Sequence, residues 1–444
     1  MRPIKKHLSL KPLIDGFKKK IANTSDIRRK SSVDYPVLDT ALSVLACMFY
    51  KSGSLLKFQR LMEKRLYKSN LNTQFGVEQI PSDNQIRTII ASIPPEQFSD
   101  VFKTYLYRLQ RGNHLKKFCF EGKYLVALDG TQYHTSEDIS CPDCLIKKKS
   151  NGKVEYSHTA LQAIICHPDR KQILPLMPEP IKNHDGDAKQ DCEINAAKRL
   201  LPKLRSQHPR MGFIWLADSI YATAPFISMI QEHKEEYIFR VKQGDHKYLY
   251  ECLETAPYQS HKSVTGTTTI AYRWYDNIAL NKSSTIKVTV IKAYVITTNK
   301  EGKQTSTIAG VWATNLVVNQ SNIIQITKAA RARWKVENQC FNALKNSGYE
   351  LTHNWGHVKG ESFNFYILTM IAFYIHQIFE LTDRLFQLCR IACVTYSDLW
   401  EELCGLFRLM LFESWEHMLV KCIENNGIYP FNLKVLVLSS ENYH

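Results

Sequence analysis

Two aspartates in this chain stand where a carboxylate could bind a catalytic cation. Asp129 follows the apolar, strand-like run 124–128, and Asp218 follows a second such run, 213–217. Carboxylates at the ends of neighbouring strands share one edge of a sheet, where they could hold Mg²⁺ beside water and substrate phosphates. Two such ions, about 3.5–4 Å apart, could hold the attacking and leaving oxygens of a phosphoryl displacement. The alternative is that each aspartate only begins a turn or caps a helix.

A third acid, Glu337, lies between two cations on a predicted helix. Arg333 is four residues earlier and therefore on the same helical face, and Lys345 lies about two turns beyond, near the same side. A carboxylate flanked by cations suits a metal ligand beside a phosphate backbone. The alternative is a surface ion pair on a solvated helix.

Three motifs around these acids resemble those of DDE insertion-sequence transposases. They are Asp-Gly-Thr at 129–131, Ala-Asp-Ser-x-Tyr at 217–221 and Arg-Trp-Lys-Val-Glu at 333–337. The resemblance covers roughly residues 120–360 and is nearest to the insertion-sequence-four family, which carries a Tyr-x2-Arg-x3-Glu-x6-Lys signature. The Arg-x3-Glu part matches this chain. The tyrosine position is Ala330, and Lys345 stands one residue later than the signature places its lysine.

The resemblance implies an α/β fold with an RNase H-like mixed sheet flanked by helices and interrupted by an antiparallel β insertion. It implies Asp129, Asp218 and Glu337 as ligands for two Mg²⁺ (or Mn²⁺) ions. The activity would be cleavage of DNA at transposon-end inverted repeats and strand transfer into target DNA, by a homodimer in the active complex. Arg333 and Lys345 would hold phosphate. Trp312, in the β insertion, would receive a flipped base, or would simply belong to the core.

Two other functions remain compatible with the same residues. One is a non-catalytic DNA-binding relative, inactivated or domesticated, that uses the basic N-terminal region and a possible zinc-binding Cys-x2-Cys segment. The other is an RNase H-like endonuclease without strand transfer. Joined products carrying the free 3′ ends would distinguish a transposase from that endonuclease.

A second metal-binding pattern lies between the first two motifs. Cys141 and Cys144 form a Cys-x2-Cys pair, and His134 and His158 are near in sequence. This pattern predicts either a structural Zn²⁺ site or a pair of reduced structural thiols.

Two further segments carry potential ligands but predict structural roles. The acids of 183–193, including Glu193, precede a helix and are expected to interact with its N-terminal dipole. The alternative is that they support the metal site. The loop with His353 and His357 is interpreted as structural or DNA-facing, since no cysteine or carboxylate partner is near in sequence.

The pattern of apolar residues and turn signals predicts five regions. Residues 1–120 are a helical, basic DNA-binding region, and 121–242 are the first part of the catalytic core, with the Cys-x2-Cys insertion at 134–158. Residues 243–320 are a β-rich insertion, 321–360 a helix completing the core, and 361–444 a helical C-terminal region. Expected strands are 124–128, 156–166, 172–178, 213–217 and 237–241, and expected helices include 38–50, 55–67, 84–92, 98–109, 191–207 and 225–232.

Charge and composition indicate a polyanionic partner. The 444 residues carry a formal charge of +16, and residues 1–70 hold sixteen lysines and arginines against five acidic residues. This basic end predicts DNA binding, or alternatively a solubilising tail. The candidate DNA contacts there are Lys18, Lys19, Lys20, Arg28 and Arg29.

The remaining composition predicts a folded protein in a reducing, cytoplasmic environment. Twelve cysteines are scattered rather than arranged as a disulfide framework, and no secretory signal is visible. The most apolar segment, 363–379, contains several polar side chains and is therefore predicted to be a buried helix rather than a membrane span.

Overall fold

The structure is a computed structural model that describes residues 6–22, 24, 34–183, 190–266, 268–298, 304–357 and 360–427. Arg28 and Arg29 lie outside these residues.

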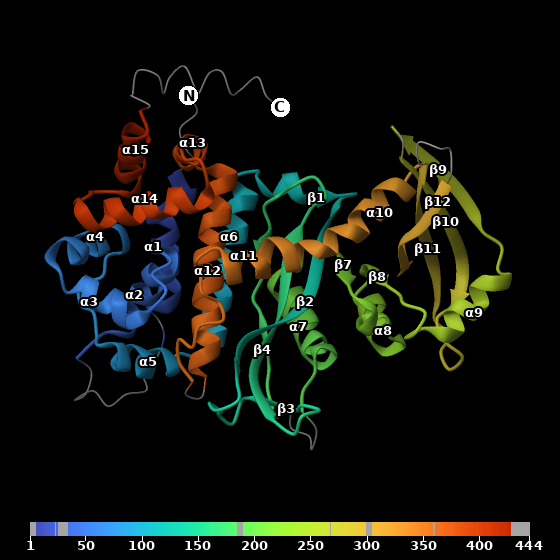
Figure 1. Ribbon diagram of the computed structural model, residues 1–444, viewed down its shortest axis with the longest axis horizontal. Coiled ribbons are helices and arrows are strands. Elements are labelled where there is room, and N and C mark those ends of the chain that lie inside the picture. The colour runs from blue at the N-terminus through green and yellow to red at the C-terminus, as the bar shows by residue number, and fades with distance from the viewer. Residues whose placement is uncertain are drawn as a thin grey trace.

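One mixed sheet of 12 strands forms the centre of the protein, with the main strand order β3-β4-β2-β7-β8-β12-β11-β10-β9 (Figure 1). β2 pairs antiparallel with β4 and parallel with β7, and β7 pairs parallel with β8. The mixed α/β class and its helical terminal regions agree with the sequence prediction. The strands are β1 (Cys119–Phe120), β2 (Lys123–Ser136), β3 (Leu145–Lys148), β4 (Val154–Cys166), β5 (Leu174–Pro175), β6 (Glu179–Ile181), β7 (Phe213–Ala217), β8 (Glu236–Arg240), β9 (Gln259–Thr265), β10 (Thr268–Ala279), β11 (Lys287–Thr298) and β12 (Gln304–Thr314).

The central strands form where the sequence has runs of apolar residues. Every residue of β7 is buried, as expected for a parallel strand covered on both faces. Helices α7 (Glu193–Gln207) and α8 (Ala224–Glu232) flank the sheet after β6 and β7, and α9 (Lys247–Thr255) follows β8.

A helical body made from both terminal regions packs beside the sheet (Figure 1). Its longest helix, α12, contacts α2 and α5, and Asn364 on α12 donates hydrogen bonds to the carbonyls of Ile90 and Ile93. α12 is long and apolar enough to span a membrane, but 83% of its most apolar window is buried within the protein, which confirms the predicted buried helix. The helices of this body are α1 (Leu10–Ile21), α2 (Val37–Phe49), α3 (Leu55–Met62), α4 (Arg65–Phe75), α5 (Asp83–Ala91), α6 (Ser99–Arg111), α12 (Glu361–Thr382), α13 (Arg384–Ala392), α14 (Tyr396–Leu409) and α15 (Trp415–Asn425).

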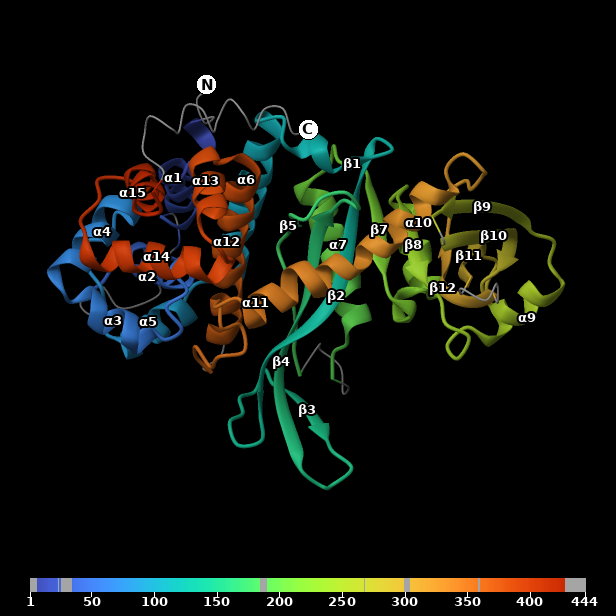
Figure 2. The same cartoon turned by 45° about the horizontal axis from the view of Figure 1, so that its top comes forward.

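A helical segment crosses the face of the sheet between the β insertion and the helical body (Figures 1 and 2). It begins with α10 (Ile323–Arg331), continues through a 3₁₀ turn, η6 (Ala332–Trp334), and a π-helical turn, η7 (Val336–Phe341), and ends with α11 (Asn342–Asn346). η6 and η7 contact β2, so this segment holds its residues against the first strand of the core.

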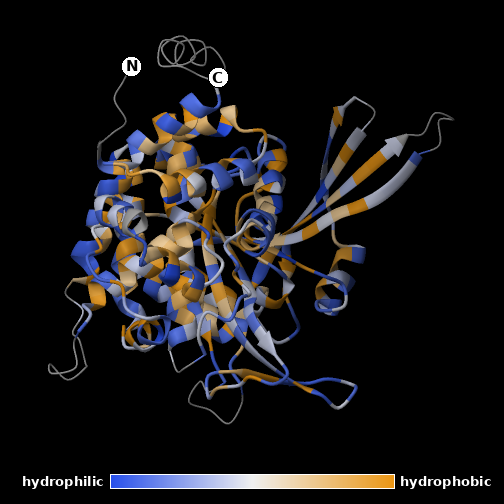
Figure 3. Cartoon of the chain, turned by 60° about the vertical axis from the view of Figure 1, so that its left-hand side comes forward, coloured by the Kyte–Doolittle hydropathy of each residue, from blue (hydrophilic) through white to orange (hydrophobic). Residues whose placement is uncertain are grey.

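Strands β9–β12 form the predicted β insertion. They are antiparallel, lie between the second and third acidic motifs in sequence, and join the core sheet where β12 pairs with β8. These strands extend away from the helical body (Figure 3). β9 is largely exposed, whereas the last five residues of β12, where it pairs with β8, are buried.

Several predicted boundaries were wrong. β2 does not end before Asp129 but continues to Ser136, because its pairing with β4 outweighs the turn tendency of Asp-Gly. The helix expected at 55–67 is divided between α3 and α4, and the strand expected at 172–178 is reduced to the two residues of β5.

Candidate functional site

Asp129 and Asp218 occupy equivalent positions on two adjacent parallel strands. The last paired residues of β2 and β7 are Ala127 and Leu216, and each aspartate comes two residues later. The sheet therefore brings these two acids to one edge, although β2 itself continues beyond Asp129. Both side chains are partly buried, at 20% and 29% exposure.

Glu337, on η7, lies at the same edge of the sheet, where Arg333 joins it to Asp129. The Arg333 side chain is buried, and its Nη2 donates to Glu337 Oε1 at 2.8 Å while its Nη1 lies 3.4 Å from Asp129 Oδ2. One guanidinium thus bridges the first and third acids. The predicted i, i+4 pair is present, but it is a buried bridge rather than the surface pair that was the alternative interpretation.

Electrostatics distinguish the two aspartates. Burial raises the pKa of Asp129 to about 7; Arg333 opposes this shift, and the charges of Glu337 and Glu193 add to it. For Asp218, burial also acts to raise the pKa, but the hydrogen bond from Lys242 and the charge of Arg333 leave it below its usual value. At neutral pH the site therefore holds one ionised aspartate and one that is near its titration point.

Asp218 has an unused buried acceptor. Its Oδ2 accepts a hydrogen bond of 3.0 Å from Lys242 Nζ, but its Oδ1 is buried and has no hydrogen-bond partner among the described residues. A buried carboxylate oxygen without a partner is costly, and a divalent cation would satisfy it. The donor set of the three acids consists of hard oxygen ligands and fits Mg²⁺ or Mn²⁺.

Glu193 is a fourth acid at this site; the sequence favoured a helix-capping role for it over a role in support of the metal site. It is the first residue of α7, its Oε2 accepts a hydrogen bond of 3.0 Å from Tyr221 Oη, and its carboxylate packs against Gly130. Burial raises its pKa, and the hydrogen bonds from Tyr221 and the Gly130 amide partly oppose this. The tyrosine of the Ala-Asp-Ser-x-Tyr motif was the available signal, but nothing local indicates that it contacts Glu193.

The π-helical turn changes the expected position of Lys345. In a regular α-helix, seven residues return a side chain to within about 20° of its starting direction, whereas eight overshoot it by about 80°. A π turn absorbs one extra residue. Because η7 contains Glu337 and continues to Phe341, before α11, the eight-residue spacing to Lys345 corresponds to seven residues of α-helix, and Lys345 is exposed on α11.

Trp312 is buried in the β insertion. It is 5% exposed on β12, and its ring covers the backbone of Gly310 so closely that a Cβ there would overlap it. This position favours the core role, and base capture would require the ring to leave it.

Sequence reasoning missed a basic and aromatic set on the β insertion. The Arg273 guanidinium lies 4.8 Å from the ring centroid of Tyr258 and 5.4 Å from that of Tyr294. Lys292 Nζ lies 5.4 Å from the ring centroid of Tyr275. Cations interleaved with aromatic rings are suited to phosphate contact and base stacking.

Cys141, Cys144, His158 and His357 form a group that could bind a structural metal such as zinc. The cysteines occupy the turn before β3, His158 is on β4, and His357 lies in the segment between α11 and α12. His357 therefore takes the place predicted for His134, and the loop interpreted as structural or DNA-facing brings this histidine to cysteines that are distant in sequence.

The surroundings of the histidines near this group favour the neutral imidazole over the protonated one. Burial, followed by the charges of His357 and His134, lowers the pKa of His158 to about 4. His134 faces His158 across the β2–β4 pair, and its ring centroid is 4.6 Å from that of His357, yet its Nε2 has no hydrogen-bond partner among the described residues.

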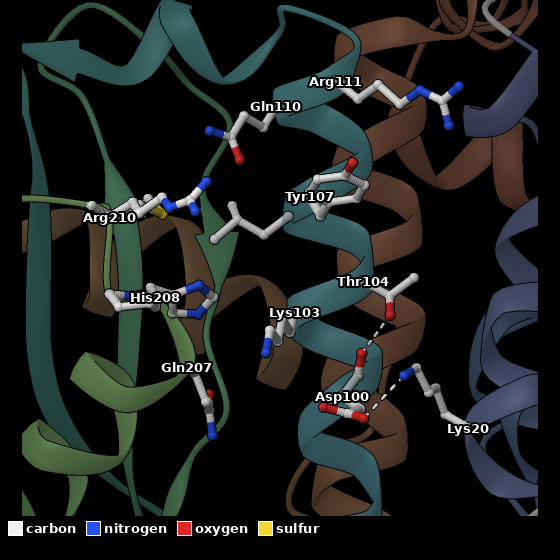
Figure 4. A pocket seen from close by; sticks show the side chains of 13 residues that line it. Lys20, Asp100, Lys103, Thr104, Tyr107, Gln110, Arg111, Gln207, His208 and Arg210 are labelled. Carbon is white, nitrogen blue, oxygen red and sulfur yellow. Dashed lines mark hydrogen bonds and ion pairs between the residues drawn. The ribbon is translucent and has the colours of Figure 1, made fainter.

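Of the three lysines at the end of α1, Lys20 borders a pocket beside the helical body. Lys18, Lys19 and Lys20 lie in the last turn of α1, Lys19 is exposed, and Lys20 Nζ lies 3.0 Å from Asp100 Oδ2. Lys20 also lines a pocket of about 640 Å³, in which side chains of α6 face those that follow α7 (Figure 4). Its other basic lining residues are Lys103, Arg111 and Arg210; His208 also lines it, but burial lowers the pKa of this histidine to about 4.

The fold and site define a mixed α/β protein with a partly buried carboxylate cluster, two of whose acids are bridged by one buried arginine. No protein-family model matches this sequence, and no curated protein sequence matches it.

Proposed function

We propose that this protein is a DDE transposase, which cleaves DNA at the ends of a mobile element and joins the freed 3′ ends to target DNA. One observation carries the proposal: Asp129, Asp218 and Glu337, far apart in sequence, converge around the buried guanidinium of Arg333. A structural ion pair would need only two of these acids.

The arrangement of elements supports the RNase H-like core that the resemblance implies. The first two acids are on adjacent parallel strands, an antiparallel partner strand lies on the other side of β2, and a β insertion precedes the helical segment with the third acid. The π turn that begins at Val336 and continues past Glu337 to Phe341 also accommodates the one-residue difference from the Arg-x3-Glu-x6-Lys signature.

Asp129, Asp218 and Glu337 would hold two divalent cations. When bound, such ions stabilise the charge on the attacking and leaving oxygens of an in-line phosphoryl displacement. The protein's own groups orient these ligands: Arg333 holds Glu337 toward Asp129, Lys242 holds Asp218, and the burial of the site strengthens each interaction.

Positive charge elsewhere suits the DNA backbone. Lys345 would contact a phosphate beside the acids, and the lysines at the end of α1, with the basic pocket next to them, would grip a DNA end. Bringing two ends together requires two copies of the chain, so the active complex would be a homodimer.

The decisive experiment is cleavage of linear DNA that carries the sequences flanking the gene, with Mg²⁺ or Mn²⁺. Wild type is compared with Glu337→Gln, which preserves size but removes the anionic ligand. Glu232→Gln, at an exposed position on α8, is the matched control.

Loss of cutting and joining in Glu337→Gln alone, with DNA binding retained, would support the proposal. Equal cutting by all three proteins would remove Glu337 from the mechanism. DNA binding without cutting by wild type would indicate a non-catalytic DNA-binding relative, and nicks without joined 3′ ends would indicate an RNase H-like endonuclease.

A further inference from the structure

We propose that Cys141, Cys144, His158 and His357 bind one structural Zn²⁺ ion, which fastens the segment after α11 to the β3–β4 hairpin. This site is separate from the carboxylate cluster and does not depend on the transposase assignment.

The distances within the group match a tetrahedral zinc site. With Zn–S bonds of about 2.3 Å and Zn–N bonds of about 2.0–2.1 Å, tetrahedral ligands are separated by about 3.8 Å for two sulfurs and about 3.6 Å for sulfur and nitrogen. The two Sγ atoms lie 3.8 Å apart. His158 Nε2 lies 3.4 Å from Cys141 Sγ and 3.6 Å from Cys144 Sγ, and His357 Nε2 lies 3.3 Å from Cys144 Sγ.

The local backbone suits thiolate ligands. The Cys-x2-Cys turn is closed by the Cys144 amide, which donates to the Cys141 carbonyl at 3.1 Å, and the Cys141 amide points to Cys144 Sγ at 3.4 Å. An N–H group directed at sulfur stabilises negative charge on it. A disulfide does not explain this pair, because bonded sulfurs are about 2.05 Å apart.

Four protein ligands indicate a structural site rather than a catalytic one. A tetrahedral zinc ion with two thiolates and two imidazoles has no position left for water or substrate. Binding would convert both cysteine thiols to thiolates and release their protons to solvent.

The role follows from where the ligands come from in the chain. Cys144 and His357 are separated by 213 positions, and only the fold brings them together. The protruding β3–β4 hairpin (Figure 2) supplies or borders three ligands, and the fourth belongs to the segment that leads from the Glu337 helix to α12. Zinc would therefore cross-link two regions that are distant in sequence.

The test is the metal content and X-ray absorption spectrum of the purified full-length protein. We expect one zinc per chain, with two sulfurs at about 2.3 Å and two nitrogens at about 2.0–2.1 Å. Cys144→Ser and His357→Ala should each reduce the zinc content by at least tenfold. His353→Ala, exposed in the same loop, and His134→Asn, beside the group but outside it, should retain the metal.

Spectroscopy of wild type keeps the test valid even where a variant fails to fold. Wild-type protein that takes up no zinc would overturn the proposal, as would a spectrum with fewer than two sulfur ligands. Loss of zinc in His134→Asn with retention in His357→Ala would also overturn it, since the fourth ligand would then be a different histidine.

Discussion

The carboxylate of Glu337 lies 2.8 Å from the guanidinium of Arg333, four residues earlier, and the same guanidinium faces Asp129 at 3.4 Å. A buried cation between two carboxylates balances their repulsion when no divalent ion is present. Arg333 and a bound metal therefore act on the same oxygens.

Arg333→Met should destabilise the metal-free protein and increase its response to metal. Removing one partner of a buried charge group leaves the other uncompensated, so we expect a loss of about 2–4 kcal/mol in the free energy of unfolding. Mn²⁺ would then replace the missing positive charge and raise the melting temperature more in the variant than in wild type. Thermal unfolding with and without Mn²⁺ measures both effects; equal responses of the two proteins to Mn²⁺ would contradict the shared role.

Metal affinity should depend on the protonation of Asp129. Its pKa of about 7 means that a divalent ion must displace a proton below that pH. The apparent affinity for Mn²⁺ should rise about tenfold from pH 6 to pH 8 and change little above it. Titration calorimetry in buffers of different ionisation enthalpy would detect the released proton, and a flat affinity between these pH values would exclude this linkage.

The same pKa has a consequence for stability. The folded value of about 7 lies above the ordinary value of about 3.9, so the protonated carboxyl stabilises the fold below about pH 4 and this contribution is lost as the pH rises through 7. In the absence of metal, Asp129→Asn should therefore be more stable than wild type at pH 8, with the difference shrinking toward pH 4. Denaturant unfolding at both pH values checks the sign.

Local sequence patterns were sufficient for some of this site. The run of apolar residues at 213–217 predicts a strand that is covered on both faces. β7 and the position of Asp218 at its end therefore followed directly from the sequence. The i, i+4 spacing of Arg333 and Glu337 likewise predicted their contact. Both signals are local and do not require knowledge of the fold.

Other features depend on contacts that no local pattern records. The continuation of β2 past Asp129 results from pairing with β4, and His357 meets Cys144 only because α11 and the hairpin are brought together. Glu193 carries the same signal as any acid at a helix N-terminus, and its contact with Tyr221 depends on the packing of α7 beside β7. Long-range pairing outweighs local tendency in each case.

Gly130→Ala should reveal whether Glu193 contributes to the metal site. A Cβ at Gly130 would overlap the Glu193 carboxylate, which is the mobile end of a side chain, so the loss of stability should be no more than about 1 kcal/mol. Metal affinity should nevertheless fall about tenfold, which corresponds to about 1.4 kcal/mol. Gly244→Ala, where a Cβ meets nothing within 4 Å, is the matched control.

Combining Gly130→Ala with a change at Glu193 tests this prediction more strictly. If Gly130→Ala acts by displacing Glu193, it should have no further effect on metal affinity in a Glu193→Ala background, because coupled changes are non-additive. Additive losses would show that Gly130 acts through another neighbour.

Lys345 should contribute to DNA binding through a single phosphate contact. Lys345→Ala should weaken binding to all sequences to a similar extent and reduce the salt-dependence slope by about 1, whereas Lys345→Arg should retain both. Fluorescence anisotropy across a salt series measures the slope. An unchanged slope in Lys345→Ala would mean that the π turn does not direct this lysine toward the DNA.

Loss of the Cys-His group should destabilise the protein and expose the segment after α11. Structural zinc adds its binding free energy to folding, so Cys144→Ser should lower the melting temperature by on the order of 5 °C or more. Limited proteolysis should then cut between residues 347 and 360, because the cross-link between His357 and the hairpin is gone. Cys119→Ser, a partly exposed cysteine outside the group, should leave both the melting temperature and the cleavage pattern unchanged. Equal protection of this segment in Cys144→Ser and Cys119→Ser would mean that packing against α12, rather than metal, holds it in place.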